Sequence, residues 1–299
     1  MNRFLWLVRR EIWEHKAIWV APAIVLGCLV VLMMTGNVHL GPIGEHGDSR
    51  LFDVAPELQR KLLVIVYAGL ALVVFMVMGI VAFFYSIDAL YADRRDRSVL
   101  FWKSLPLSDV ETVMSKFAVA IVAIPLVALA ASAVAQLVMA AGGSARLAMS
   151  GLPGAIMWDP QALAGGFVVA FLWCVTAMLW YSPIVGYLML ASAWAPRGPF
   201  LWAVLPPVGL WILERVVVGS EHIGDFITDR LFGLYRLLGQ ESGGEVNRSG
   251  GDLERIGNVD LVGALRDFYA SPELWLGVAA AFLLLAGAVW VRRYRDETS

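Results

Sequence analysis

Long stretches without charge alternate along the chain with short stretches in which charged residues gather. A membrane-spanning helix needs roughly 20 mostly apolar residues. Uncharged runs of this length occur at 17–35, 62–87, 117–145 and 274–291. A further apolar tract, at 160–213, is interrupted only by Arg197. At about 1.5 Å per residue this tract is far too long to cross a roughly 30 Å hydrocarbon core once.

Two helices are expected within the tract at 160–213. Residues 195–199 combine two helix-breaking prolines with an arginine, so they predict a tight turn. A turn at Ser182 and Pro183 instead would leave Arg197 inside the membrane, at a cost of about 2.5–3.5 kcal/mol. Ser182 and Pro183 therefore predict a kink. The sequence predicts six spans, at about 17–35, 62–87, 117–141, 163–194, 199–219 and 274–291.

Composition narrows the class of protein. Hydrophobic residues make up 59% of the chain, charged residues 16%, and the mean hydropathy is +0.71. Soluble domains carry about 45–50% apolar and about 25% charged residues. These values exclude a soluble enzyme, a disordered chain and a basic nucleic-acid binder. Cys28 and Cys174 lie in apolar stretches and fit buried free thiols. We therefore expect an all-α integral membrane protein with one transmembrane domain over 1–299.

Lysine and arginine predict the orientation of the chain. They are dense near the membrane at 3–16, at 94–116, at Arg197 and at 292–295. The opposite side carries fewer basic residues close to the spans. By the positive-inside rule, both termini are expected in the cytoplasm. The first apolar run is expected to remain as a span, because no small-residue cleavage site follows it.

The segments outside the spans carry local signals of their own. Residues 1–16 predict an amphipathic helix on the inner membrane surface; the alternative is a frayed start that only orients the first span. The segment 220–273 predicts an external cap of two amphipathic helices, at 221–238 and 252–269. Its alternative is a partly disordered connector.

The loop at 88–111 is the most informative segment. Five charged residues stand together at 93–97, and an apolar aromatic run and Pro106 follow. Ser108 and Glu111 predict a capping box that starts the helix of the third span. A short helix at 93–104 could not bury its aromatic residues alone. It is either a protein-binding hot spot or a basic loop whose aromatic residues enter the lipid headgroups.

The sequence from Asp93 to Ser98, then Leu100-Phe101, then Ser104-Leu105-Pro106-Leu107-Ser108 and Lys116, resembles the pattern of ABC transporter type-2 permeases. The six-span layout, the surface helix before the first span and the external helices before the sixth are also similar to that family. Leu107 stands where valine is commoner, and the external segment is longer than in many members.

The resemblance implies that the chain is the transmembrane permease subunit of a bacterial ABC exporter in the cytoplasmic (inner) membrane. It implies that 93–104 is a coupling helix that docks two copies of a cytoplasmic ATPase subunit. A second permease copy or a paralogue would complete the translocation pathway as a dimer. ATP and Mg²⁺ would be bound by the ATPase partner, with no cofactor on this chain. The implied docking residues are Asp93, Arg94, Arg95, Asp96, Arg97, Leu100, Phe101 and Trp102.

Motifs of catalysis are missing from the sequence. No phosphate-binding loop, His-Glu-x-x-His motif or Gly-x-Ser-x-Gly elbow occurs, so the chain is not expected to be catalytic by itself. His39, Glu45, His46 and Asp48 could bind a metal ion, but their spacing matches no known ligand motif, and no metal site is predicted. No nucleic-acid partner is expected, whereas membrane lipids are.

The alternative function is an ion-coupled or passive secondary carrier that acts without ATP. Such carriers usually hold charged residues within their spans, and here the candidates are Asp88 and the adjacent Glu214 and Arg215. Because adjacent residues on a helix point in different directions, we expect Glu214 and Arg215 each to point to a different neighbour or to the lipid headgroups. The uncharged polar residues either line a pathway or form interhelical hydrogen bonds. The principal ones are Ser132, Gln136 and Thr176.

Overall fold

The computed structural model describes residues 3–35, 55–96, 108–239 and 261–295, and these contain helices and no strand. Six of the helices are long and apolar enough to cross a membrane, which supports a multi-pass membrane protein. The elements are α1 (Arg3–Glu14), α2 (Ala17–Thr35), α4 (Pro56–Arg95), α6 (Asp109–Ala118), η1 (Val119–Ala123), α7 (Ile124–Met149), η2 (Gly154–Trp158), α8 (Pro160–Trp180), α9 (Ser182–Trp194), α10 (Pro199–Leu213), η3 (Glu214–Val218), α11 (His222–Gly239), α13 (Leu261–Ala270) and α14 (Pro272–Arg295).

Two of the helices are much longer than the spans predicted for them. Helix α4 has 40 residues, and the continuous helix α6–η1–α7 has 41. At about 1.5 Å per residue each is about 60 Å long, twice the roughly 30 Å hydrocarbon core. Each of these helices is therefore longer than a perpendicular crossing of this core requires, whereas α2 has the bounds expected from its uncharged run.

The predicted span at 163–194 consists of two helices, α8 and α9, separated by Tyr181. The backbone of Tyr181 stays in the right-handed helical region, with φ −86° and ψ −1°. Pro183 has no N–H to donate, and the hydroxyl of Ser182 donates instead to the carbonyl of Leu179 at 2.8 Å. Helix α9 ends at Trp194 and α10 begins at Pro199, on either side of the predicted turn. Gly198 has a positive φ of 59° there, a conformation that glycine adopts without strain.

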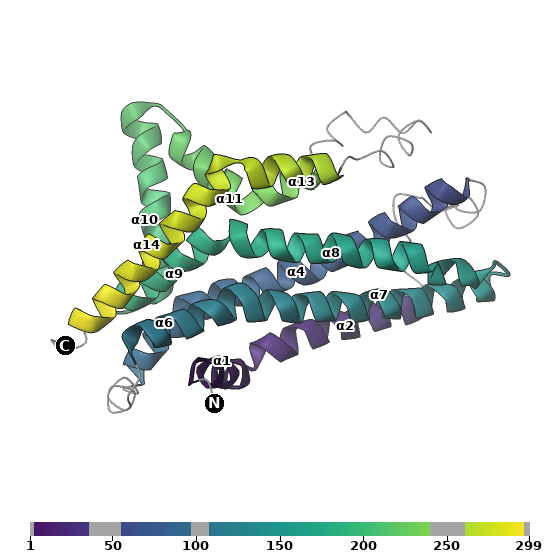
Figure 1. Ribbon diagram of the computed structural model, residues 1–299, viewed down its shortest axis with the longest axis horizontal. Coiled ribbons are helices and arrows are strands. Elements are labelled where there is room, and N and C mark those ends of the chain that lie inside the picture. The colour runs from purple at the N-terminus through teal and green to yellow at the C-terminus, as the bar shows by residue number, and fades with distance from the viewer. Residues whose placement is uncertain (1–2, 36–54, 97–107, 240–260, 296–299) are drawn as a thin grey trace.

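Small residues allow the long helices to pack closely. Helices α2, α4, α7 and α8 lie side by side, α10 and α14 stand at one end, and α11 and α13 lie beside α8 (Figure 1). A Cβ added to Gly166 on α8 would meet Tyr67 of α4 at 2.6 Å. Buried alanines on α7, Ala128 and Ala135 among them, provide a similar close approach.

The connection from α7 to α8 is fixed by polar contacts with α4. The hydroxyl of Tyr67 donates to the carbonyl of Met157 at 2.5 Å. Asp159 caps α8 by accepting from the backbone N–H groups of Gln161 and Ala162, and it pairs with Arg60 at 3.1 Å. Burial alone would raise the pKa of Asp159, but these hydrogen bonds together lower it below its ordinary value.

Replacing Asp159 with Ala is expected to destabilise this connection. Loss of a helix N-cap costs about 1 kcal/mol, so the thermal midpoint should fall by about 2 °C. Because the folded pKa of Asp159 is lowered, its contribution is present above pH 4 or so and is lost as the pH falls through the folded pKa. Thermal unfolding at pH 7 and at successively lower pH tests this. Asn can still cap the helix, so Asp159→Asn should lower the thermal midpoint less than Asp159→Ala does.

Candidate functional site

Charged side chains from four helices meet in a buried cluster, which we call the ion network. It consists of Glu11 on α1, Asp93 on α4, Asp109 and Lys116 on α6, and Arg292 on α14. Lys116 Nζ lies 3.0 Å from Glu11 Oε1 and 3.4 Å from Asp93 Oδ1. Arg292 Nη1 lies 2.9 Å from the other oxygen of Asp93, and its Nε donates to Asp109 at 3.1 Å. All except Asp109 are at most 7% exposed.

Neighbouring groups complete the pairing of Glu11. Its Oε2 accepts from the hydroxyl of Tyr85 at 3.3 Å, and its Oε1 accepts from Arg10 at 3.3 Å. The ring of His15 stands edge-on to that of Tyr85, with centroids 4.7 Å apart. With Arg10 included, three carboxylates face three cations. Such pairing is required because an unpaired buried charge is costly.

Local sequence explains how the network residues reach one place. Glu11 follows Phe4 by seven residues and Val8 by three, so it shares the inward face of α1. The predicted capping box is present: the hydroxyl of Ser108 accepts from the Glu111 N–H, and the Glu111 carboxylate accepts from the Ser108 N–H. This cap starts α6 at Asp109.

Two residues of the ion network lie near the predicted coupling segment, 93–104, in the sequence. Asp93 is its first residue, and Asp109 lies five residues after its last, Ser104. Residues 97–107, with Arg97, Leu100, Phe101 and Trp102, lie outside the described residues. Their docking role stays a prediction.

The described docking candidates divide into two pairs. Asp93 is buried in the ion network, and Arg94 donates to the carbonyls of Ser192 and Ala195 at the end of α9, at 2.6 and 2.9 Å. The side chains of Asp93 and Arg94 therefore bind within the chain, and their docking role stays a prediction. Arg95 and Asp96 form an exposed ion pair at 2.9 Å, and Arg95 also approaches Asp88 at 3.8 Å. Of the four described candidates, Arg95 and Asp96 have the exposed charged groups.

The three charged residues considered for a carrier, Asp88, Glu214 and Arg215, make local polar contacts. Asp88 is 45% exposed and lies 3.8 Å from Arg95. Glu214 accepts from the Ser220 hydroxyl and from the first N–H groups of α11, whereas Arg215 pairs with Glu221 at 3.4 Å. The expectation that Glu214 and Arg215 face different partners is therefore confirmed. Within the described residues, the buried charged side chains are those of Glu11, Asp93, Lys116 and Arg292 in the ion network and that of Arg230 on α11. Sequence reasoning did not nominate Glu11, Asp109 or Arg292 as site residues.

The nominated polar residues of the spans are all buried, in different settings. The Ser132 hydroxyl donates to the carbonyl of Leu129 in its own helix at 2.8 Å. The hydroxyl of Thr176 forms a 2.8 Å hydrogen bond with that of Tyr269, joining α8 to α13. Nε2 of Gln136 has no hydrogen-bond partner within the described residues. Of the three, Thr176 makes an interhelical hydrogen bond.

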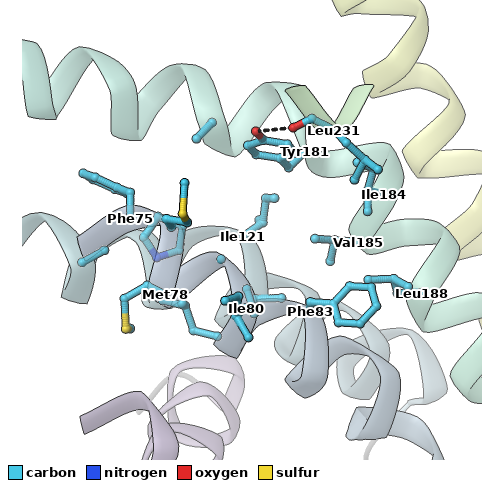
Figure 2. A pocket seen from close by; sticks show the side chains of 18 of the residues that line it. Phe75, Met78, Ile80, Phe83, Ile121, Tyr181, Ile184, Val185, Leu188 and Leu231 are labelled. Carbon is cyan, nitrogen blue, oxygen red and sulfur yellow. Dashed lines mark hydrogen bonds between the residues drawn. The ribbon is translucent and has the colours of Figure 1, made fainter. Parts of the chain in front are cut away.

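An apolar cavity of about 560 Å³ lies between α4, η1, α7, α8, α9 and α11. Figure 2 shows apolar side chains pointing into it from these elements, with Tyr181 and Leu231 on one side. The hydroxyl of Tyr181 donates to the carbonyl of Leu231 at 3.2 Å. Ser132, Gln136 and Thr176 do not line this cavity.

A π-helical turn forms part of the cavity wall. The N–H of Ile124 donates to the carbonyl of Val119, five residues back. Pro125, the next residue, has no N–H and cannot continue the regular pattern of the helix. Such turns occur often at functional sites, and this one places Ala120 and Ile121 at the cavity.

Comparison with protein-family models, with curated proteins and with solved structures finds no match for this chain. The ion network and the apolar cavity are therefore the features from which a function can be proposed.

Proposed function

We propose that the chain is the permease subunit of an ATP-driven ABC exporter. In this proposal it pairs with a second copy or a paralogue and docks two separate ATPase subunits through residues 93–104. The ion network is the observation that carries the proposal. Asp93 begins this segment and Asp109 lies five residues after its end, and the ion network joins both residues to α14 and, through Lys116, to α1. A force on the segment would therefore act on four helices together.

The same helices connect the ion network with the apolar cavity. Helix α4 carries Asp93 and, about three turns earlier, the cavity residue Phe83. Lys116 on α6 precedes the cavity residue Ile121 by little more than one turn. A displacement at the network end of these helices would therefore reach the cavity wall, as ATP-driven opening and closing requires.

The positions of the chain ends also support this arrangement. Glu11 near one end and Arg292 near the other both bind Lys116 or Asp93, so the two ends of the described chain lie at the same end of the bundle as α6 (Figure 1). An even number of membrane crossings places both ends of a chain on the same side of the membrane. In the proposed orientation this end is cytoplasmic, where an ATPase would bind.

Affinity purification of the chain in mild detergent from its native host tests the proposal. The expected result is a near-stoichiometric partner that contains a phosphate-binding loop, with vanadate-sensitive ATPase activity. Mass spectrometry identifies the partner. Recovery of the chain without an ATPase, even after cross-linking, would contradict the proposal.

The second candidate function is a secondary carrier that acts without ATP. It is favoured by the buried charges of Asp93, Lys116 and Arg292, because ion-coupled carriers use such residues to bind the coupling ion. Their mutual pairing favours a structural role instead. Proteoliposomes that contain the purified chain and an entrapped pH-sensitive dye distinguish the two for proton coupling. A proton-coupled carrier changes the dye signal without ATP, whereas the permease without its ATPase is expected to leave the dye signal unchanged.

A further inference from the structure

We propose that the apolar cavity binds one hydrocarbon chain of a membrane lipid. The cavity volume of about 560 Å³ lies within the range of about 300–1,000 Å³ that is typical of ligand-binding pockets. This inference concerns the purified chain and does not depend on an ATPase partner.

The lining determines the chemistry of the occupant. Apart from the hydroxyl of Tyr181 and the indole N–H of Trp173, the side chains that line the cavity are apolar or absent, and the Tyr181 hydroxyl already donates to the carbonyl of Leu231. A polar or charged ligand would lose its hydrogen bonds with water without replacement. Bound water is disfavoured for the same reason, since a buried water needs two to four polar partners.

An empty cavity is also unfavourable, because its lining atoms lose dispersion contacts on one side. A hydrocarbon chain restores these contacts and requires no hydrogen bond. The hydrophobic effect adds little when a chain moves from the bilayer into the protein, since both are apolar. Occupancy of the cavity therefore depends on how well the hydrocarbon chain fits its shape and contacts its lining.

The rim of the cavity indicates the route of entry. Met76, Ile80 and Phe84 on α4 line the cavity and are each more than half exposed. All three belong to a helix that is apolar and long enough to span the membrane, so their exposed faces contact hydrocarbon. A lipid chain can enter sideways from the bilayer, while Leu231 and Phe232 of α11 bound the cavity on another side.

Two glycines on α4 provide a matched pair of variants. Gly79 lines the cavity, whereas Gly69 does not, and a Cβ added at either position meets nothing within 4 Å. Gly79→Trp places an indole at the cavity, and Gly69→Trp places one elsewhere on the same helix. Equal thermal midpoints and elution volumes would show that both variants fold.

The experiment uses phosphatidylcholine with a photoreactive diazirine in mid-chain, present as a small fraction of the phosphatidylcholine vesicles that contain the full chain. After irradiation, peptide mass spectrometry is expected to find labels enriched within 75–84 and 184–188 over those on the other lipid-facing helices. Gly79→Trp should lose most of this labelling, and Gly69→Trp should retain it.

Three results would overturn the proposal. One is labelling spread evenly over the lipid-facing helices without enrichment at the cavity, which the wild-type chain alone can reveal. Another is unchanged labelling of a folded Gly79→Trp variant. The third is absence of label at the cavity together with a dimer that Gly79→Trp dissociates, which would assign the cavity to a second copy of the chain.

Discussion

Replacing Lys116 with Met is expected to lower the free energy of unfolding by about 3–5 kcal/mol, because Glu11 and Asp93 then lose the cation between them. Lys116 is 3% exposed, so water cannot take the place of its ammonium group without opening the structure. A fall of more than about 5 °C in the thermal midpoint should follow, measured from tryptophan fluorescence in mild detergent.

Lys16→Met is the matched control for this prediction. It removes the same charge from an exposed position near the end of α1, and its effect should be within about 0.5 kcal/mol. The double variant Glu11→Gln/Lys116→Met should lose less stability than the sum of the two single variants, because it leaves one fewer unpaired charge. If Lys116→Met proved as mild as Lys16→Met, the ion network would not hold these helices together.

The local features of the fold follow from short-range patterns in the sequence. The run at Ala17–Thr35 is uncharged and helical over its whole length, and the capping box of Ser108 and Glu111 forms as its spacing predicts. The break at Tyr181 follows from Pro183, whose missing N–H is a property of one residue. Features of this kind depend only on neighbours along the chain.

The ion network could not be predicted in the same way. Lys116 and Glu11 are separated by 105 positions, and Arg292 and Asp93 by 199. Helical spacing can show that Glu11 shares a face with Val8, but it does not show which helix that face meets. A charged residue near a helix end is usually solvated, and this expectation fails when four helix ends converge.

The apolar cavity is hidden from the sequence for a related reason. Its lining residues, such as Met78 and Val185, have the same character as the rest of the bundle core. A cavity is the space left between helices after they pack, and its volume depends on how they pack. Pro125 is the one local signal, since it marks the π-helical turn in the cavity wall.

Replacing Phe101 and Trp102 together with Ala is expected to abolish co-purification of the ATPase subunit. Aromatic residues at the centre of an interface contribute about 2 kcal/mol or more each, so a complex that depends on both should not survive purification. The amount of ATPase per permease chain is the measurement, with membrane insertion and thermal midpoint determined on the same samples. The midpoint should match the wild type, because every residue of the ion network is retained.

Trp6→Ala/Trp13→Ala is the matched control for loss of two large aromatic residues. Both tryptophans are at least half exposed on α1, outside the proposed docking segment, so the complex should be recovered in normal yield. Normal recovery of the Phe101→Ala/Trp102→Ala complex would contradict docking through this segment.

Together, Lys116→Met and Phe101→Ala/Trp102→Ala separate two roles of the same region. Loss of stability with Lys116→Met and loss of the partner with Phe101→Ala/Trp102→Ala would show that the ion network anchors a segment whose own side chains bind the ATPase.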